Sequence, residues 1–548
     1  MRISRRWIKA SLYVGLIVVS FRASLAQLAD EARHVGQFYA TEDGFSGNVI
    51  VYRDGHVISN ESYGLANVEW RIPATETTRF AICSETKQFT AASILLLQEQ
   101  GLLHTTDKLS QHYPETPEAW KDVTLRQLLQ HTSGIPDGVR ISGTGGYDQG
   151  QRTPQEIVRS VATQPLVFPS GSRTEYNNMG YVMLGLVIEK VSGQTYAEFL
   201  QKHFFAPLNM QDSGLGSTTE VIPNKAYGYI PGKPVKAADP LPYDILYSAG
   251  GIYSTGADLA KWLIALHGGR VLKHESYDEM TTADPDGFGY GLKVSIQHGQ
   301  KDIGHDGQWA GFISENDYFP ATKTGLIVLT NQANGPSTPG THSITTNLMA
   351  LACDEHAIVR ALGGEQNVNP AILQRYVGTY RSSDSDSKDT LQIAIVDHHL
   401  RLTPAGHSTS TLMAQAETRF YMKEWDGEAE FREDHSGVVT LDIFTVSVWS
   451  GFQLPTSPSL SSRGSLKTVT INLAASLMDF LHGASGRGDR ELAGTRGRRL
   501  PVSGCSSRKE IRYSAGATVR TDRWKHPLCL SGLGCYESSL SFSLECSG

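Results

Sequence analysis

The sequence predicts an α+β fold in which an antiparallel sheet is flanked by helices, carries an inserted helical subdomain and precedes a small all-β barrel. Alternating strand patterns occur at residues 46–64 and return at residues 287–332, with helical patterns between them. A sheet built from both ends of one domain fits that order. Beyond residue 370, short alternating runs replace the helical patterns, which predicts the barrel.

The size of the chain indicates more than one domain. It has 548 residues, of which 40% are hydrophobic, so it can bury a large core. Its formal net charge of −7 comes from 49 basic and 56 acidic residues and is mild for this length. Such a charge gives no reason to expect a nucleic-acid partner.

Residues 1–26 are predicted to be a signal peptide. They combine a basic start, an apolar stretch and the small residues Ser24 and Ala26 before a cleavage position. The segment SRRWIK resembles a degenerate twin-arginine signal, although two arginines in a basic start more often supply only charge. We expect a secreted or periplasmic protein without a transmembrane anchor after cleavage.

Residues 27–361 form the predicted first domain. A helical pattern at residues 28–40 is followed by a hairpin signal around Asp54-Gly55. Helices come next, and the strand patterns at the end of the domain are those of residues 287–297, 311–320 and 324–332.

Composition changes near residues 362–370, and residues 371–455 are predicted to form the small β-barrel. Its alternating runs lie at residues 391–402, 418–425, 429–434 and 438–446, and residues 382–389 are predicted to be an exposed loop.

Periodic patterns stop near residue 456, so residues 456–548 are predicted to be a disordered tail. Two alternatives remain open: a reading-frame artefact, or a small module stapled by cysteines. The four cysteines available for it are Cys505, Cys529, Cys535 and Cys546.

Ser84 and Lys87 form an S-x-x-K pattern at the start of a helix, so their side chains share one face. The lysine can then help to remove the serine proton. Ser385/Lys388 and Ser506/Lys509 match the same pattern, but both lie in polar, loop-like segments. Only Ser84 precedes a helix that is hydrophobic on every side. The alternative is that Ser84 merely caps this helix.

A second motif lies at Tyr176 and Asn178, the only Y-x-N in the chain, just before another apolar helix. In this order the motifs resemble the serine β-lactamase and penicillin-binding-protein superfamily, and most closely its class C and esterase-like branch. The resemblance covers roughly residues 36–355. Residues 122–138 and 248–263 also resemble family segments, and we interpret them as scaffold.

Two positions compete for the third motif of this family. A literal K-T-G begins at Lys323, but it follows Pro320 between two apolar runs, where a hairpin turn is expected. His305 and Gly307 form an H-x-G pattern, which the class C and esterase-like branch commonly carries at this point. We therefore assign the motif to His305. His34 and His267 also fit H-x-G, and the assignment therefore depends on the order of the motifs.

The resemblance implies that Ser84 is the nucleophile, with Lys87 and Tyr176 sharing the acid and base roles. It further implies that Asn178 orients the substrate and that the backbone N–H groups of Ser84 and Gln308 form the oxyanion hole. No cofactor or metal is expected. The adjacent His398 and His399 should lie on opposite faces of a strand, which suits no metal site.

The expected substrate is a small molecule or a short peptide with an ester, amide or β-lactam bond. Replacing the family's lysine by His305 weakens the fixed positive charge for a substrate carboxylate, which favours esters and amides. The alternative function is a catalytically inactive sensor of cell-wall peptides. The β domain resembles the lipocalin-like C-terminal domain of this branch, either as a structural addition or as a cover for the cleft.

Overall fold

The computed structural model describes residues 25–139, 153–232, 234–240, 242–309, 311–332, 340–355, 357, 365–382, 390–404, 408–424, 427–433, 438–445, 467–471, 508–512 and 518–522. The predicted signal peptide lies almost wholly outside the described residues, and so does the predicted loop at residues 382–389. In the part of the chain that is described, no helix has both the length and the apolar character needed to cross a membrane.

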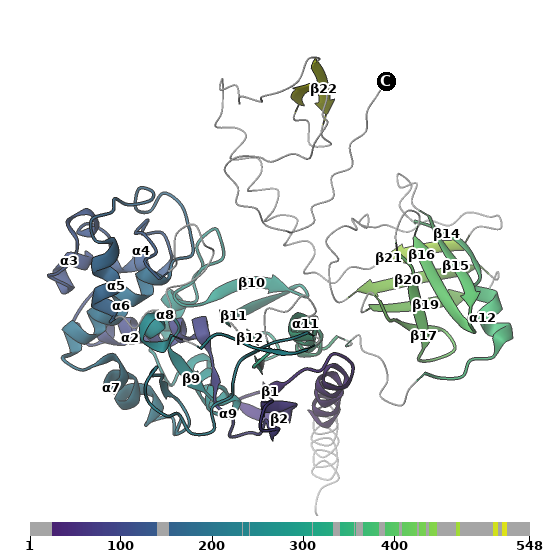
Figure 1. The fold of residues 1–548 in the computed structure, drawn as a ribbon, viewed down its shortest axis with the longest axis horizontal. Helices are drawn as coiled ribbons and strands as arrows, with labels where there is room; N and C mark the ends of the chain where they lie inside the picture. Colours follow the sequence, from purple (N-terminus) through teal and green to yellow (C-terminus); the bar gives the residue numbers. More distant parts are fainter. Residues whose placement is uncertain are drawn as a thin grey trace, which may run out of the picture.

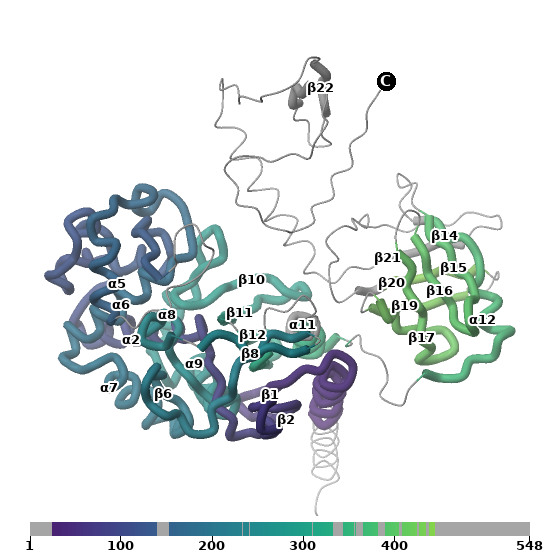
Figure 2. Tube along the Cα trace, in the orientation of Figure 1, coloured from purple at the N-terminus to yellow at the C-terminus, as the bar shows by residue number. Residues whose placement is uncertain are grey.

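A six-stranded antiparallel sheet forms one layer of the first domain (Figure 1). In spatial order its strands are β10 (Lys293–Gln297), β11 (Gln300–Trp309), β12 (Phe312–Phe319), β13 (Thr324–Thr330), β1 (Gly47–Arg53) and β2 (His56–Tyr63). Strand β1 pairs with β13 from Gly47 opposite Thr330 to Arg53 opposite Thr324. Figure 2 shows the purple β1 and β2 in the same part of the molecule as the teal β10, β11 and β12, and β13 lies between β12 and β1 in the sheet. The prediction that both ends of the domain build one sheet is confirmed.

Helices occupy the interval between β2 and β10 and flank the sheet, as predicted. Residues 25–42 are helical. The other helices of this domain are α2 (Thr86–Glu99), α3 (Leu109–His112), α4 (Leu125–Leu129), α5 (Pro154–Val161), α6 (Asn178–Ser192), α7 (Tyr196–Leu200), α8 (Tyr243–Gly250), α9 (Gly256–His267), α10 (His274–Met280) and α11 (Gly340–Ala352), with single turns η1 (Cys83–Glu85), η2 (Glu118–Trp120) and η3 (Gln201–Phe205).

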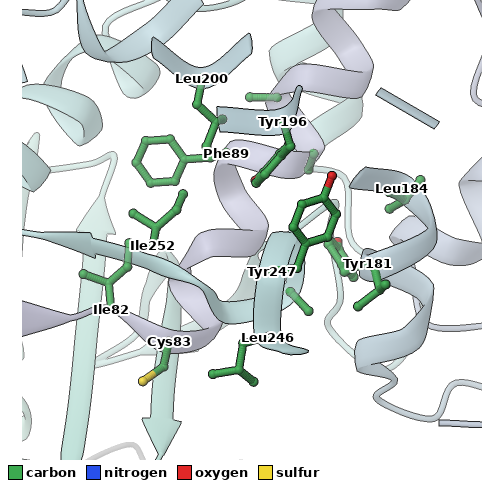
Figure 3. Packing of buried hydrophobic residues seen from close by; sticks show 14 of the residues in the cluster. Ile82, Cys83, Phe89, Tyr181, Leu184, Tyr196, Leu200, Leu246, Tyr247 and Ile252 are labelled. Carbon is green, nitrogen blue, oxygen red and sulfur yellow. The ribbon is translucent and has the colours of Figure 1, made fainter. Parts of the chain in front are cut away.

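Helix α2 runs through the centre of the helical part. Residues 86–95 are all buried, which agrees with a sequence that has no polar face. Phe89 stacks on Trp262 with ring centroids 4.0 Å apart, and Figure 3 shows Phe89 beside Leu200 and Ile252. The helix ends before Gly101, whose φ of 73° lies in the left-handed region that favours glycine.

Seven short strands complete the first domain. They are β3 (Leu65–Asn67), β4 (Ile72–Pro73), β5 (Phe80–Ala81), β6 (Gly214–Leu215), β7 (Tyr229–Ile230), β8 (Lys236–Ala237) and β9 (Ile252–Ser254). Strands β5, β9 and β6 form a three-stranded sheet. Because β5 ends at Ala81, this small sheet fixes the chain immediately before Ser84.

The predicted barrel follows the first domain (Figure 1). It is preceded by α12 (Pro370–Tyr376), and its strands are β14 (Gly378–Ser382), β15 (Thr390–Val396), β16 (His399–Pro404), β17 (Ser410–Ala414), β18 (Arg419–Met422), β19 (Gly427–Glu433), β20 (Val439–Thr445) and β21 (Lys467–Ile471). The seven strands from β14 to β20 pair antiparallel in chain order, and β21 pairs parallel with β14 and β20 to close the barrel. Tyr421 of the barrel packs edge-on against Phe38 of the first helix, with centroids 5.5 Å apart.

Three described strands lie within residues 456–548, the predicted disordered tail. One is β21 of the barrel, and the others are β22 (Arg508–Arg512) and β23 (Thr518–Asp522), which pair antiparallel with each other. The sequence showed no periodic pattern from which these strands could be predicted. The four cysteines of the proposed stapled module lie outside the described residues.

Candidate active site

Ser84 lies in the turn η1, between the short strand β5 and helix α2. Its neighbour Cys83 is buried and has a φ of 48°, a left-handed conformation that is uncommon outside glycine and often found at functional sites. The N-cap of α2 is Glu85, and no side chain accepts the capping hydrogen bond there. Ser84 lies one residue before this N-cap, so it does not cap α2, and its side chain is half-buried.

Lys87 lies on the first turn of α2 and is completely buried. Its Nζ donates hydrogen bonds to Ser84 Oγ at 3.1 Å, to Asn178 Oδ1 at 2.9 Å and to the Ala249 carbonyl oxygen at 2.7 Å. Burial lowers the pKa of Lys87 to about 7, although Asp137 and Asp306 act in the opposite direction. A neutral amine is therefore accessible near pH 7, within hydrogen-bond reach of the serine hydroxyl.

Tyr176 lies in the loop before α6, and its hydroxyl donates a hydrogen bond to Ser84 Oγ at 2.8 Å. The ammonium group of Lys87 lies 4.8 Å from the centroid of the Tyr176 ring. The N-cap of α6 is Asn177, whose side chain accepts a hydrogen bond from the Gly180 N–H at 2.8 Å. Asn178, the first residue of α6, is buried and directs its side-chain oxygen at Lys87.

Strand β11 brings His305, Gly307 and Gln308 close to the turn that carries Ser84. A Cβ atom at Gly307 would lie 2.4 Å from the Ile82 carbonyl oxygen and 2.9 Å from the Ser84 nitrogen. Only glycine therefore permits this approach between β11 and η1. Gln308 follows Gly307 on the strand and is exposed.

His305 is 4% exposed, and its ring centroid lies 6.3 Å from that of Tyr176. Its Nδ1 lies 2.5 Å from the Asp306 carbonyl oxygen, whereas Nε2 has no hydrogen-bond partner among the described residues. Burial lowers the pKa of His305 to about 4, so the ring is neutral at pH 7. The adjacent Lys293 is paired with Asp306 at 2.5 Å.

The competing patterns lie elsewhere. Lys323 has a φ of 51° in the turn between β12 and β13, which is the hairpin position that its context predicts. Ser385, Lys388 and Ser506 lie outside the described residues, and Lys509 lies on β22. The structure thus brings together Ser84, Lys87, Tyr176, Asn178, His305 and Gly307, with Gln308 next to Gly307.

Several groups around the site were missed by sequence reasoning. The Ala249 carbonyl, which binds Lys87, belongs to a segment that was interpreted as scaffold. Asn316 on β12 donates to Glu85 Oε2 at 2.5 Å and to the His305 carbonyl oxygen at 3.3 Å, which joins the nucleophile turn to β11. His131, from the other scaffold segment, packs on Tyr176 with centroids 4.5 Å apart. No motif marks such backbone and second-layer contacts.

Among the described residues, no group of three or more His, Cys, Asp or Glu side chains is placed to hold a metal ion. His398 has a φ of 68° in the turn before β16, so it does not alternate with His399 along a strand as expected.

The chain as a whole is similar to known proteins. The family model described as Beta-lactamase matches residues 32–345, more than half of the chain. Penicillin-binding protein 4* of Bacillus subtilis (strain 168) is 27% identical over 419 residues, covering 71% of this chain and 90% of that protein.

Two solved structures are also similar. The octameric penicillin-binding protein homologue from Pyrococcus abyssi has 27% identity and a TM-score of 0.53, covering 74% of this chain and 97% of that one. The D-amino acid amidase from Ochrobactrum anthropi SV3, complexed with L-phenylalanine amide, has 25% identity and a TM-score of 0.52, covering 61% and 99%.

Proposed function

Because the chain belongs to the beta-lactamase family, we propose that it is an exported serine hydrolase that acts through an acyl-enzyme on Ser84. One observation carries this proposal: Ser84 Oγ accepts hydrogen bonds from both Lys87 Nζ and Tyr176 OH. A serine hydroxyl is a weak nucleophile on its own, and two adjacent proton-transferring groups are the arrangement that activates it.

In the first step, Ser84 Oγ attacks the carbonyl carbon of the substrate while its proton passes to neutral Lys87, directly or through Tyr176. The bond from that carbon to the leaving nitrogen or oxygen then breaks, and the same groups return the proton to the leaving atom. In the second step, a water molecule attacks the ester on Ser84, and the acid product leaves with Ser84 restored.

The negative charge that develops on the substrate oxygen needs hydrogen-bond donors. The close approach of Gly307 to the Ser84 nitrogen supports an oxyanion hole between β11 and η1. We assign it to the backbone N–H groups of Ser84 and Gln308.

We propose uncharged esters and amides, including short peptides, as preferred substrates over carboxylate-bearing β-lactams. The neutral state of His305 at pH 7 supports this choice, because no fixed cation then stands at that position. The neighbouring cation Lys293 is paired with Asp306. The similar amidase from Ochrobactrum anthropi SV3 is complexed with a small amide, which is consistent with this class.

Covalent labelling tests the proposal. Wild-type protein should react with a fluorophosphonate, and mass spectrometry should place the adduct on Ser84. Ser84→Ala should abolish the adduct with little loss of stability, because it removes one hydroxyl. Ser93→Ala is the matched control, since Ser93 lies on the same helix and donates only to the Phe89 carbonyl at 2.7 Å.

An adduct on another serine, or one that persists in Ser84→Ala, would reject the assignment. A folded wild-type protein that binds fluorescent penicillin reversibly but forms no adduct would instead indicate the inactive sensor. Initial rates on short-chain esters, D-amino-acid amides and cephalosporins then identify the substrate class.

A further inference from the structure

Tyr176 occupies a loop, so its position depends on what holds that loop. It precedes the first residue of α6 and follows a segment without helix or strand. A general acid or base must stay within hydrogen-bond reach of its partner, and a displacement of about 1 Å can cost about 100-fold in rate. The residue that fixes Tyr176 is therefore important for the chemistry.

His131 holds the backbone on both sides of Tyr176. Its carbonyl oxygen accepts a hydrogen bond from the Glu175 N–H at 2.9 Å. Its ring Nδ1 accepts one from the Asn177 N–H at 3.1 Å. One residue thus binds the amide groups immediately before and after the tyrosine.

The ring of His131 also holds the ring of Tyr176. The two centroids lie 4.5 Å apart with the planes tilted by 33°. The histidine ring has two further ring contacts. Its centroid lies 5.2 Å from that of Tyr181, and Phe288 packs edge-on against it with centroids 5.3 Å apart. His131 is 2% exposed, so it has little freedom to move.

The backbone of His131 is adapted to this role. Its φ of 58° is left-handed, a conformation that asparagine and histidine tolerate better than most residues. Burial holds the pKa of His131 well below its usual value, and the positive charge of protonated Lys87 acts in the same direction. The ring therefore stays neutral, and Nδ1 keeps the lone pair that accepts from Asn177.

We propose that His131 is a positioning residue for Tyr176. It holds the phenolic oxygen within reach of Ser84 Oγ through one hydrogen bond of its backbone carbonyl, one hydrogen bond of its ring Nδ1 and the contact between the two rings. The inference rests on the proposed acyl-enzyme function of Ser84. His131 would act on the chemistry by holding Tyr176, and its bond to the Asn177 N–H also lies next to Asn178, which binds Lys87.

Two substitutions separate the contacts of His131. In His131→Asn, the side-chain oxygen takes the place of Nδ1 as acceptor and the left-handed backbone is tolerated, but the ring is lost. In His131→Phe, the ring remains but the acceptor is lost. If His131→Phe does not fold, His131→Ala replaces it, because it also removes the acceptor.

His267→Phe is the matched control. His267 is half-buried and is stacked on a tyrosine, with its centroid 4.1 Å from that of Tyr318. Burial lowers its pKa to about 3, so its ring is also neutral at pH 7. Among the described residues its ring packs on Tyr318 and Tyr277 and bonds the Tyr277 hydroxyl, away from Ser84, Lys87 and Tyr176. The substitution should lower the melting temperature and leave kcat within about 3-fold of wild type, as distant substitutions do.

The decisive measurement is a double-mutant cycle with Tyr176→Phe, using kcat and KM for hydrolysis of a short-chain p-nitrophenyl ester. His131→Phe should lower kcat by about 10- to 100-fold with little change in KM, and His131→Asn should restore most of it. In the Tyr176→Phe background, His131→Phe should cost less than about 3-fold, because the group that it positions is already gone.

The outcomes are distinguishable. If His131→Phe or His131→Ala keeps wild-type kcat, or lowers it equally with and without the Tyr176 hydroxyl, the inference is wrong. If the wild-type protein forms no adduct on Ser84, the proposed acyl-enzyme function is rejected, and the role of His131 is rejected with it. Wild-type acylation with an unaffected His131 variant rejects the positioning role alone.

Discussion

At the scale of single residues, the site depends on a lysine that burial keeps close to neutrality. Lys87 makes three hydrogen bonds, to Ser84, Asn178 and Ala249, and all of its partners are oxygen acceptors. None of these three acceptors is a carboxylate, and the effect of burial outweighs that of the Asp137 and Asp306 carboxylates, which favour the cationic form. Such an amine can take a proton and return it within one turnover.

The pH dependence of the rate tests this role. Lys87 has its pKa lowered to about 7, so its basic form disappears as the pH falls through that value. We expect kcat/KM to fall about 10-fold per pH unit below 7 and to level off above it. Lys87→Met should lower kcat/KM by about 100- to 10,000-fold and remove the inflection. A wild-type profile that stays flat from pH 5.5 to 9 would exclude Lys87 as the base.

A second prediction distinguishes His305 from Lys323. His305→Ala should lower kcat/KM by roughly 1 to 3 kcal/mol, the usual effect of deleting a polar contact to a bound substrate. Lys323→Ala, in the turn between β12 and β13, should leave kcat/KM almost unchanged.

His305→Lys should improve turnover of carboxylate-bearing β-lactams relative to neutral esters. Equal preferences in folded wild type and His305→Lys would mean that another part of the cleft sets selectivity.

At the scale of elements, the decisive contact is that of β11 with the nucleophile turn. Gly307→Ala would place a methyl group 2.4 Å from the Ile82 carbonyl oxygen, so β11 or η1 must move. We expect the acylation rate to fall by about 100-fold or more, because the oxyanion donors shift with the strand. Gly232→Ala is the control, since the nearest atom to its added Cβ is 3.4 Å away. Equal acylation rates in both variants would argue against the close approach.

The sequence predicted those elements whose pattern is local. The hairpin at Asp54-Gly55, the buried helix after Ser84 and the turn at Lys323 each combine periodicity with turn residues, and each is present. The contacts of His131 with the Tyr176 loop join residues 131 and 175–177 through backbone amides. Backbone groups are the same in every residue, so no sequence pattern could have predicted these contacts.

Asn178 likewise makes a contact that the sequence did not predict. The resemblance implied contact with substrate, and the structure adds a hydrogen bond to buried Lys87. No motif in the sequence singles out Glu85, although burial raises its pKa to about 8 and it joins η1 to β12 through Asn316. A carboxyl beside a nucleophile is unremarkable in sequence, because its burial depends on strands more than 200 residues away.

At the scale of the whole molecule, the barrel and the first domain can be tested separately. A chain ending at residue 455 lacks β21, which pairs with both β14 and β20, whereas a chain ending at residue 475 keeps it. Both should acylate Ser84 at the wild-type rate. The shorter chain should show a barrel transition that melts several degrees lower by calorimetry, because two strand pairings are lost. Loss of acylation in either chain would mean that the barrel or tail contributes to the site.

Because β1 pairs with β13, the sheet beside Ser84 can form only after most of the first domain has been synthesised. Gly47 lies opposite Thr330, and the nucleophile turn contacts β11, which is made only after most of the domain. During synthesis, the chain can therefore form α2 long before it can form the sheet that orders the serine beside it. Proteins dominated by such distant pairings fold slowly, because the loop must close before the contacts stabilise it. A fragment that ends before residue 330 lacks the strand that pairs with β1, so we expect it to leave Ser84 without the surroundings that the proposed acylation requires.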